Sequence, residues 1–200
     1  MNIKDLQDGI PFPNIYPGVS IEDQQTADER IPLLLQTPAA KRFVSYEPAI
    51  GPVDFARIQA TPSDSYGGGL MYDLTRNICF EPGDVKGYRI EGLDWLIMGG
   101  ESGPGARPMH PDWARSVRDQ CKAAGVAFFF KQWGEWASIE SDEDDFILKG
   151  SDAVIHLDGS FETGKQLMVD LNKNDVLMRR VGKKAAGCLL DGKEHKELLR

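Results

Sequence analysis

Short apolar runs recur along the first two-thirds of the chain, and each is followed by polar or glycine-rich positions. The runs are Gly18-Val-Ser-Ile21, Arg42-Phe-Val-Ser-Tyr46, Leu93-Asp-Trp-Leu-Ile-Met98 and Val126-Ala-Phe-Phe-Phe130. Their length and the turn residues around them predict β-strands. The third run is nearly continuous, which is typical of a strand covered on both faces of a parallel sheet.

Helical patterns lie between these runs. Thr26-Ala-Asp-Glu29 has the spacing of a capping box, and Pro32 either kinks the helix that follows or marks the first turn of a shorter one. A short helical segment is expected around 53–58. Pro111 opens another helix, which Gly125 closes. The apolar positions that these helices present to a core are Ile31, Leu34 and Leu35 in the first, and Trp113, Val117 and Cys121 in the last.

Four strands separated by helices or long crossovers favour a parallel sheet or part of a barrel. We therefore expect an α/β fold with a partial, half β/α barrel of parallel strands in residues 1–137. Residues 60–92 read as a long insertion with little core of its own. A small C-terminal β/α appendage follows in residues 138–200. In it, residues 154–159 resemble a hairpin arm with an Asp-Gly turn, and residues 178–190 read as a short helix or a glycine-punctuated loop.

Composition and charge limit the class of protein and the cellular location to be expected. With 41% hydrophobic and 27% charged residues, the chain is globular in composition. The net charge of -8 argues against strong non-specific binding to nucleic acid, so nucleic acid is possible but not indicated. No apolar run approaches the roughly 20 residues of a membrane helix, and the polar segment Met1–Asp8 lacks the apolar stretch of a secretory signal. We expect a cytoplasmic protein that does not enter membranes.

The three cysteines give no basis for a metal site or a disulfide framework. Cys79, Cys121 and Cys188 are odd in number, lie far apart and include no C-x-x-C pair. Free cysteines behave as small hydrophobic residues, so buried, reduced thiols are expected. No residue is therefore assigned to a metal.

Polar residues fall at the carboxyl ends of all four expected strands. In parallel α/β folds ligands bind there, because side chains and free backbone amides converge. Carboxylates and a lysine around one rim can hold a polar ligand or share protons. The alternative is that these side chains cap helices and tie loops together. The catalytic candidates are Glu47, Glu101 and Lys131, and the ligand-binding candidates are Glu22, Asp23, Ser45, Gly99, Gly100, Ser102 and Gln132.

Three further features leave alternatives open. The segment 99–103 lacks the lysine and the glycine spacing of phosphate and dinucleotide loops, but its glycines would let a ligand approach the backbone. His110 precedes a helix and is read as a capping or surface residue, with a catalytic role as the alternative. Trp133 and Trp136 flank a glycine and could stack on a ring, although packing is the favoured interpretation.

Several consecutive motifs resemble one known family. They are Gly18–Gln24, Ala27–Leu35, Glu47-Pro48 with Gly51–Val53, Gly99–Pro111, Phe128–Trp136, and Gly182–Gly187 with Leu190–Gly192. The chain resembles, outside residues 60–90 and 138–177, a phage and prophage family of unknown function. That family carries a three-cysteine motif near its amino terminus and is similar to radical S-adenosylmethionine enzymes.

The resemblance implies that this chain contains one part of the family's fold and lacks another. Family members are longer at the amino terminus, where the extra part would supply the first barrel strands and the cysteines for a [4Fe-4S] cluster. The strand ends of this chain would then form the far wall of a cofactor and substrate pocket. No cofactor is expected in this chain alone, but S-adenosylmethionine is implied as a possible one. A protein partner or self-association would be needed to cover the open sheet, in the host cytoplasm if the chain is phage-encoded.

Two functions from different classes follow. The chain is half of a split or truncated radical enzyme, or it is a non-catalytic phage accessory protein that binds a host protein or nucleic acid. The second is motivated by the acidic run at residues 140–145 and by the long insertion. A cofactor-free binder or hydrolase has less support, since no nucleophile and base are identifiable as a pair.

Overall fold

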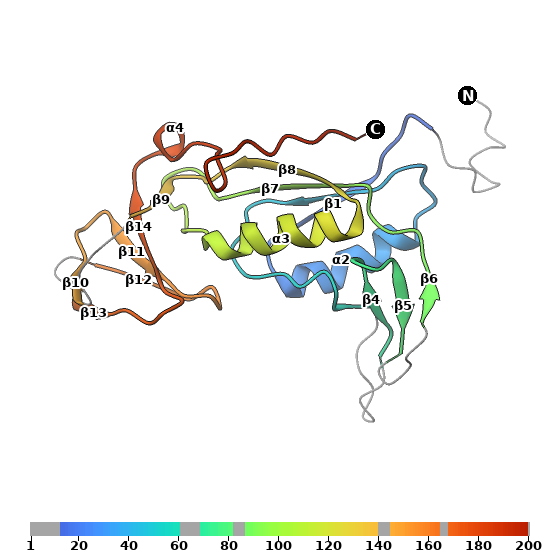
Figure 1. Ribbon diagram of the computed structural model, residues 1–200, viewed down its shortest axis with the longest axis horizontal. Coiled ribbons are helices and arrows are strands. Elements are labelled where there is room, and N and C mark those ends of the chain that lie inside the picture. The colour runs from blue at the N-terminus through green and yellow to red at the C-terminus, as the bar shows by residue number, and fades with distance from the viewer. Residues whose placement is uncertain (1–12, 61–68, 82–86, 140–144, 165–167, 200) are drawn as a thin grey trace.

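A parallel β-sheet forms the centre of the protein in the computed structural model (Figure 1). The structure describes residues 13–60, 69–81, 87–139, 145–164 and 168–199. The sheet has four strands in the order β1-β2-β7-β8, and every neighbouring pair is parallel. The strands are β1 (Gly18–Ile21), β2 (Phe43–Tyr46), β7 (Trp95–Gly99) and β8 (Ala127–Gln132). All four expected strands and the α/β class are confirmed.

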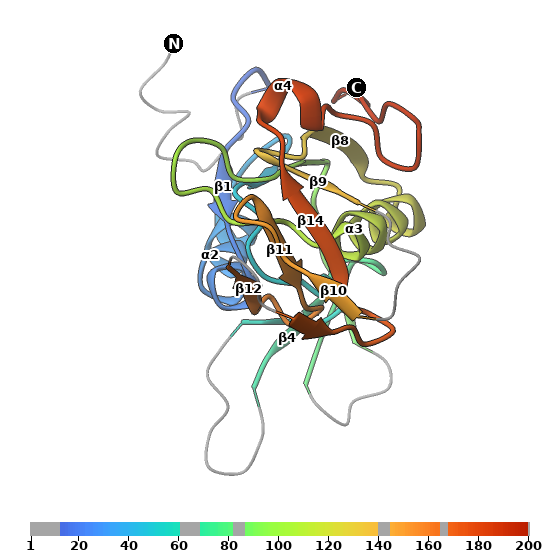
Figure 2. The ribbon, with the colours of Figure 1, turned by 90° about the vertical axis from the view of Figure 1, so that its left-hand side faces the viewer.

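Two helices, α2 (Gln24–Gln36) and α3 (Pro111–Ala124), pack on the same face of this sheet (Figures 1 and 2). The capping box of α2 is formed by Asp23 and Thr26, not by Thr26 and Glu29, so the helix begins earlier than expected and continues through Pro32. The expected limits of α3 are confirmed, since Pro111 is its first residue and Gly125 caps it in the left-handed conformation.

Alternation along the strands separates two faces of the parallel sheet. Ile21, Val44, Leu96 and Phe128 are buried beneath α2 and α3, and the last three are each followed two residues later by another buried residue. Apart from Gly99 at the end of β7, positions of the other parity are half-buried or exposed. The expectation that β7 is covered on both faces is therefore corrected: among the described residues, helices cover one face.

We call the second face the open face. It carries Phe43, Ser45, Trp95, Ile97 and Phe129, all of them half-buried. The ring centroids of Phe43 and Trp95 are 6.0 Å apart and those of Trp95 and Phe129 are 6.2 Å apart. An aromatic row thus crosses the sheet on the side without helices.

The insertion is a small antiparallel sheet, ordered β3-β4-β5-β6. Its strands are β3 (Ile58–Gln59), β4 (Met71–Asp73), β5 (Ile78–Phe80) and β6 (Tyr88–Arg89). Tyr72, Leu74 and Cys79 are buried and join the main core, so the expectation of little core is corrected. Residues 61–68 and 82–86 lie outside the described part.

The short helix expected around 53–58 is also corrected. Turns occupy this segment until β3 begins at Ile58. Val53 and Phe55 are buried, and the Phe55 amide donates to the Gln120 side chain of α3. Contacts with α3 therefore replace the local hydrogen bonds that a helix would have made.

Residues after 135 form antiparallel strands. One sheet is ordered β12-β11-β14-β9, and β10 pairs with β13. The expected Asp-Gly turn is confirmed between β11 and β12, and residues 178–190 contain the end of β14 and a short helix. The division of the chain into residues 1–137 and 138–200 stays a prediction. The elements are β9 (Trp136–Ser138), β10 (Asp145–Ile147), β11 (Asp152–Ile155), β12 (Phe161–Thr163), β13 (Met168–Asp170), β14 (Val176–Arg180) and α4 (Lys183–Ala186).

The segment 187–199, which we call the tail, returns along the outer edge of β8 (Figure 1). The Phe130 amide donates to the His195 carbonyl at 2.8 Å, and the Glu197 amide donates to the Phe128 carbonyl at 3.2 Å. At the opposite edge, no segment of the described chain pairs with the outer side of β1, where Arg30 donates to the Ser20 carbonyl. The described strands therefore form an open sheet, not a closed barrel, and the half barrel stays a prediction.

Candidate ligand-binding rim

Glu47, Lys131 and Gln132 meet at the carboxyl ends of β2 and β8. Lys131 Nζ donates to Glu47 Oε2 at 2.8 Å, and Gln132 Nε2 lies 3.3 Å from Glu47 Oε1. Together with Gly99 at the end of β7, we call these residues the rim. Four of the sequence-based candidates thus occupy one place, as the convergence of parallel strand ends predicts.

Strand alternation places Glu47 on the open face, two positions after Ser45. A register shift between Met98 and Gly99 brings Gly99 opposite Gln132. The missing side chain of Gly99 leaves room for the Glu47 carboxylate: a Cβ on Gly99 would lie 2.9 Å from Glu47 Oε1, so the carboxylate would have to shift. Ser45 lies half-buried on the open face and opposite Ile97.

Gln132 fixes the position of the Glu47 carboxylate. Its side chain is buried, and Nε2 donates to the Gly100 carbonyl at 2.7 Å. Its Oε1 accepts a hydrogen bond from the Gly134 amide. A Cβ on Gly100 would lie 2.1 Å from the Trp133 carbonyl oxygen, so the loops after β7 and β8 run in close contact. Three hydrogen bonds therefore hold the Gln132 side chain, and one of them is to the Glu47 carboxylate.

The rim ion pair is open to solvent. The Lys131 side chain is 50% exposed and that of Glu47 is 22% exposed. Such a pair stabilises a protein by only about 0–1 kcal/mol, because water screens it. Both charges are consequently available to a polar ligand at a small cost in folding energy.

Glu101 follows the same strand end but turns away from this pair. Both of its oxygens accept hydrogen bonds from the Arg107 side chain, at 2.8 and 3.0 Å. Hydrogen bonds from Arg107 lower the pKa of Glu101 below its ordinary value. A carboxylate held ionised in this way suits loop closure better than proton sharing. The sequence analysis missed Arg107, which lies in a glycine- and proline-rich loop without periodicity.

Glu22 and Asp23 act locally at the start of α2. Glu22 accepts two hydrogen bonds from Arg30, at 3.0 and 3.2 Å. Asp23 caps the helix by accepting from the Thr26 amide at 2.9 Å. Ser102 is exposed and has no hydrogen bond among the described residues. These three candidates are not brought to the rim pair by their side chains.

His110 and the two tryptophans have packing and capping roles. His110 is fully buried, and its Nδ1 accepts from the Asp112 amide as the cap of α3. Trp136 is buried and donates to the Ala106 carbonyl. Trp133 packs edge-on against Phe130 with a centroid distance of 4.8 Å. The capping and packing interpretations account for all three side chains.

The cysteines do not fit an iron-sulfur cluster. Cys79 lies on β5, Cys121 on α3 and Cys188 in the tail. Burial raises the pKa of Cys121 to about 12, with a further contribution from Glu197, which disfavours the thiolate that iron needs. Cys79 and Cys121 are buried as expected, whereas Cys188 is half-buried. Within the described ranges, no three His, Cys, Asp or Glu side chains are grouped as metal ligands.

The whole described core and the rim lie within one family match. Residues 2–199 match the family described as Protein of unknown function (DUF5131). The chain belongs to this family. No curated protein and no solved structure is significantly similar to it. The match spans the parallel sheet, the insertion and the antiparallel strands alike.

In the part of the chain that the structure describes, no helix is long and apolar enough to cross a membrane.

Proposed function

We propose that this chain is a phage-type, ligand-binding half of a radical S-adenosylmethionine-like enzyme, active when a second polypeptide extends the parallel sheet. The observation that carries the proposal is the asymmetry of that sheet. Helices cover one face, whereas the other carries a half-buried aromatic row across the strands and the Glu47–Lys131 pair at their carboxyl ends. In β/α barrels the corresponding face is the interior and the corresponding end binds the ligand.

The open face is graded from apolar to polar. Phe43 and Trp95 lie in register near the amino ends of the strands, Ser45 and Ile97 in the middle, and Glu47 at the carboxyl end. A ligand with a polar head and an apolar body would match this gradient. The ammonium of Lys131 and the carboxylate of Glu47 can pair with a ligand carboxylate and ammonium, the groups of an amino acid such as the methionine part of S-adenosylmethionine.

The second polypeptide would supply the iron-sulfur cluster, because the cysteines of this chain do not fit one. A [4Fe-4S] cluster would need cysteines from the second polypeptide, because Cys79, Cys121 and Cys188 lie on separate elements. The outer edge of β1 is where further strands would pair, since the tail already occupies the edge of β8. Residues of this chain would bind and orient the ligand and exclude water from it.

Thermal unfolding with S-adenosylmethionine tests the ligand part. We expect a ligand-dependent rise in melting temperature that Glu47→Gln and Lys131→Ala reduce by more than half, because a bound ligand stabilises the folded state. Lys149→Ala, at an exposed lysine of the antiparallel part, is the control and should leave the rise unchanged. No rise at millimolar ligand, or an equal loss in the control, would refute this assignment.

Iron and sulfide analysis tests the partner part. The chain is co-expressed with the product of an adjacent gene, and the purified complex is assayed for iron, sulfide and cleavage of S-adenosylmethionine. A colourless, iron-free complex without cleavage would contradict the enzyme proposal.

A non-catalytic accessory function has its own supporting observation. Glu22, Asp23 and Glu101 are all engaged in capping or loop contacts. Under this proposal a host protein or nucleic acid would remain bound to the variant carrying Glu47→Ala, Glu101→Ala and Lys131→Ala. Residues 140–144 of the acidic run lie outside the described residues.

A further inference from the structure

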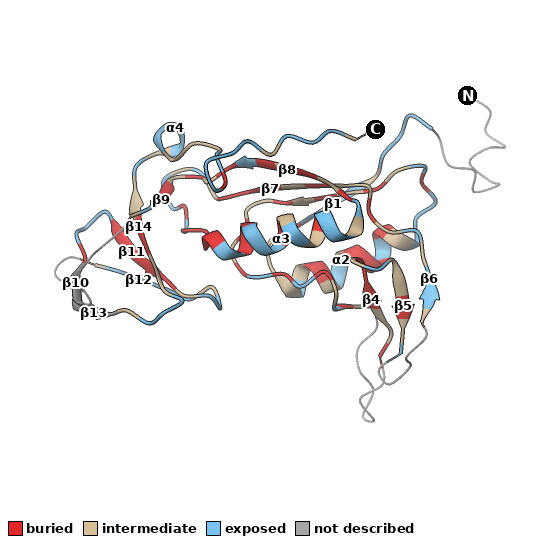
Figure 3. Cartoon of the chain, in the orientation of Figure 1, coloured by how far each residue is buried: buried red, intermediate tan, exposed pale blue. Residues whose placement is uncertain are grey.

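The tail is attached to the rest of the protein mainly through polar contacts. Most of its residues are exposed (Figure 3), and Leu190 is the buried one. The carbonyls of Leu189 and Glu197 accept hydrogen bonds from the indoles of Trp133 and Trp95, at 2.8 and 3.0 Å. Backbone pairing with β8 adds two more hydrogen bonds. Segments with so little apolar burial detach at a much lower free energy than a sheet unfolds.

A groove of about 1400 Å³ separates the tail from the last turns of α3. The segments that lead into β7 and β8 form its floor. Its lining carries as many Asp and Glu side chains as Lys and Arg side chains, so the groove has no excess charge of either sign. The tail therefore does not pack against α3 along its length.

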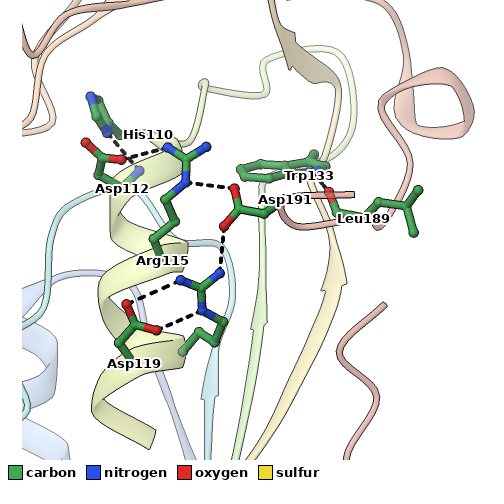
Figure 4. Close-up of polar contacts among 8 residues, drawn as sticks. His110, Asp112, Arg115, Asp119, Trp133, Leu189 and Asp191 are labelled. Atoms are coloured by element: carbon green, nitrogen blue, oxygen red, sulfur yellow. Dashed lines mark hydrogen bonds and ion pairs between the residues drawn. The ribbon is translucent and has the colours of Figure 1, made fainter. Parts of the chain in front are cut away.

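Asp191 makes the polar contacts between the tail and α3 within the described ranges. A tight turn, closed by backbone hydrogen bonds of 2.9 and 3.1 Å between Leu190 and Lys193, presents its carboxylate to the helix. Arg115 Nε donates to this carboxylate at 2.9 Å (Figure 4), and Arg118 Nη1 donates at 2.6 Å. These hydrogen bonds, that of Arg118 first, lower the pKa of Asp191, so the carboxylate is charged at neutral pH. One charged and partly exposed contact thus fastens the tail to α3.

One buried atom of the attached tail lacks a partner. Nε2 of His195 is inaccessible and makes no hydrogen bond with the described residues. The imidazole ring packs against Phe128 with a centroid distance of 5.9 Å, and the His195 carbonyl accepts from the Phe130 amide. A buried nitrogen without a partner costs free energy, which is recovered when water reaches it. Attachment of the tail therefore carries a cost that detachment relieves.

We propose that the tail is a strap that opens as a unit from the edge of β8, with the contact of Asp191 to Arg115 and Arg118 as its latch. Opening breaks the pairing with β8, hydrates His195 Nε2 and leaves the outer edge of β8 free to pair with another extended strand. Because the latch is partly exposed, salt and loss of the Asp191 charge both shift the strap towards the open state. This device is independent of the ligand and the second polypeptide of the proposed function.

Hydrogen exchange of the β8 amides in the full chain, followed by NMR, measures the opening. The amides of Phe128 and Phe130 donate to the tail, at Glu197 Oε2 and at the His195 carbonyl, whereas the Phe129 amide faces β7. We expect the two edge amides to exchange faster than that of Phe129. In about 1 M sodium chloride their exchange should be about threefold faster than in dilute buffer, and that of Phe129 should not change.

Asp191→Asn removes the charge of the latch and keeps a residue type that tolerates the positive φ of 52°. It should speed exchange of the Phe128 and Phe130 amides about fivefold and abolish its dependence on salt. Glu194→Gln is the matched control, because it also removes one negative charge from the tail, but its ion pair with Lys196 lies within the tail. This control should exchange like the unmodified chain.

His195→Phe keeps an aromatic ring on Phe128 and removes the unpartnered nitrogen, so it should slow exchange of both edge amides. Equal or faster exchange would contradict the cost assigned to that nitrogen. The proposal is overturned if the amides of Phe128, Phe129 and Phe130 exchange at one rate, which would mean that the tail detaches only when the whole sheet unfolds. It is also overturned if Asp191→Asn exchanges like Glu194→Gln.

Discussion

Lys131 Nζ lies 2.8 Å from Glu47 Oε2, although the two residues are 84 positions apart in sequence. Their strands are not neighbours, since β7 lies between β2 and β8. The two side chains meet across β7 at Gly99, where no side chain intervenes. One glycine in the central strand therefore permits a charged contact between its two neighbours.

Gly99→Ala should separate the rim pair. The new methyl group would lie 2.9 Å from Glu47 Oε1, so the carboxylate must shift and its contact with Lys131 is disturbed. We expect a destabilisation of at most about 1 kcal/mol, because the exposed ion pair contributes little, together with loss of the ligand-dependent rise in melting temperature. Urea unfolding and thermal shift with S-adenosylmethionine measure the two effects.

Gly105→Ala is the control for that substitution. A Cβ on Gly105 meets no atom within 4 Å, and its φ lies outside the left-handed range. Stability and ligand response should both be preserved. Equal losses in the two variants would contradict the steric explanation.

Lys131→Met should weaken ligand binding while leaving the fold almost as stable as before. The Lys131 side chain is 50% exposed, so loss of its ion pair with Glu47 is expected to change the unfolding free energy by less than about 1 kcal/mol. Calorimetric titration and urea unfolding of the same preparation separate the two quantities. A loss of several kcal/mol would mean that the pair stabilises the fold and is not held for a ligand.

Short apolar runs and the turn residues around them were enough to predict the parallel sheet. The runs ending at Ile21, Tyr46, Met98 and Phe130 each form a strand of it. The same signal could not distinguish a helix-covered face from an open one, because Trp95 and Ile97 are as apolar as Leu96 and Met98. Whether a face of the sheet is covered depends on which other elements or chains pack on it. The sequence of the strand itself does not contain that information.

Rim residues were predicted only in part for a related reason. Glu47, Lys131 and Gln132 converge because their strands are parallel and close together. Glu101 stands at an equivalent strand end, but its carboxylate is bound by Arg107, six positions later in an irregular loop. Side-chain partners within loops have no periodicity from which they can be inferred. The tail is missed likewise, since its pairing with β8 spans more than 60 residues.

Acidification should destabilise the antiparallel sheet through Asp152. This carboxylate is fully buried and accepts from Arg179 Nε at 2.7 Å, and the Arg179 hydrogen bonds lower its pKa. Because the folded pKa lies below the unfolded value of about 4, the stabilisation is complete above pH 4 and is lost as pH falls through the folded pKa. Unfolding free energies from urea titrations between pH 7 and pH 2 measure this loss.

Asp152→Asn should remove this dependence on pH. We expect the variant to be less stable at pH 7 by about 1–3 kcal/mol, because a charged hydrogen bond is lost, and to change less between pH 4 and pH 2. Asp54→Asn, at an exposed carboxylate, serves as the comparison and should keep the original profile. If the unfolding free energies of Asp152→Asn and of the unmodified chain change equally with pH, Asp152 is not the origin of the pH dependence.

Removal of residues 194–200 should expose the edge of β8. The Phe130 amide would lose the His195 carbonyl, and the Phe128 carbonyl would lose the Glu197 amide. An unpaired parallel edge next to the open face favours association, so we expect oligomers or aggregates by light scattering at concentrations where the full chain does not form them. Leu198→Ala, at an exposed tail residue, should not cause association. Identical light scattering by the truncated and full chains would contradict the covering role of the tail.

Phe129→Ala and Phe130→Ala should differ sharply, although the residues are adjacent. Phe130 is fully buried against the helices, and its truncation is expected to cost about 3–5 kcal/mol through lost burial and a cavity. Phe129 lies half-buried on the open face, so its truncation should cost about 1 kcal/mol. If a second polypeptide covers the open face, Phe129→Ala should weaken that complex at least tenfold while the isolated chain stays folded. Urea unfolding of both variants checks the first difference, and similar costs for the two would mean that the open face is already packed within this chain.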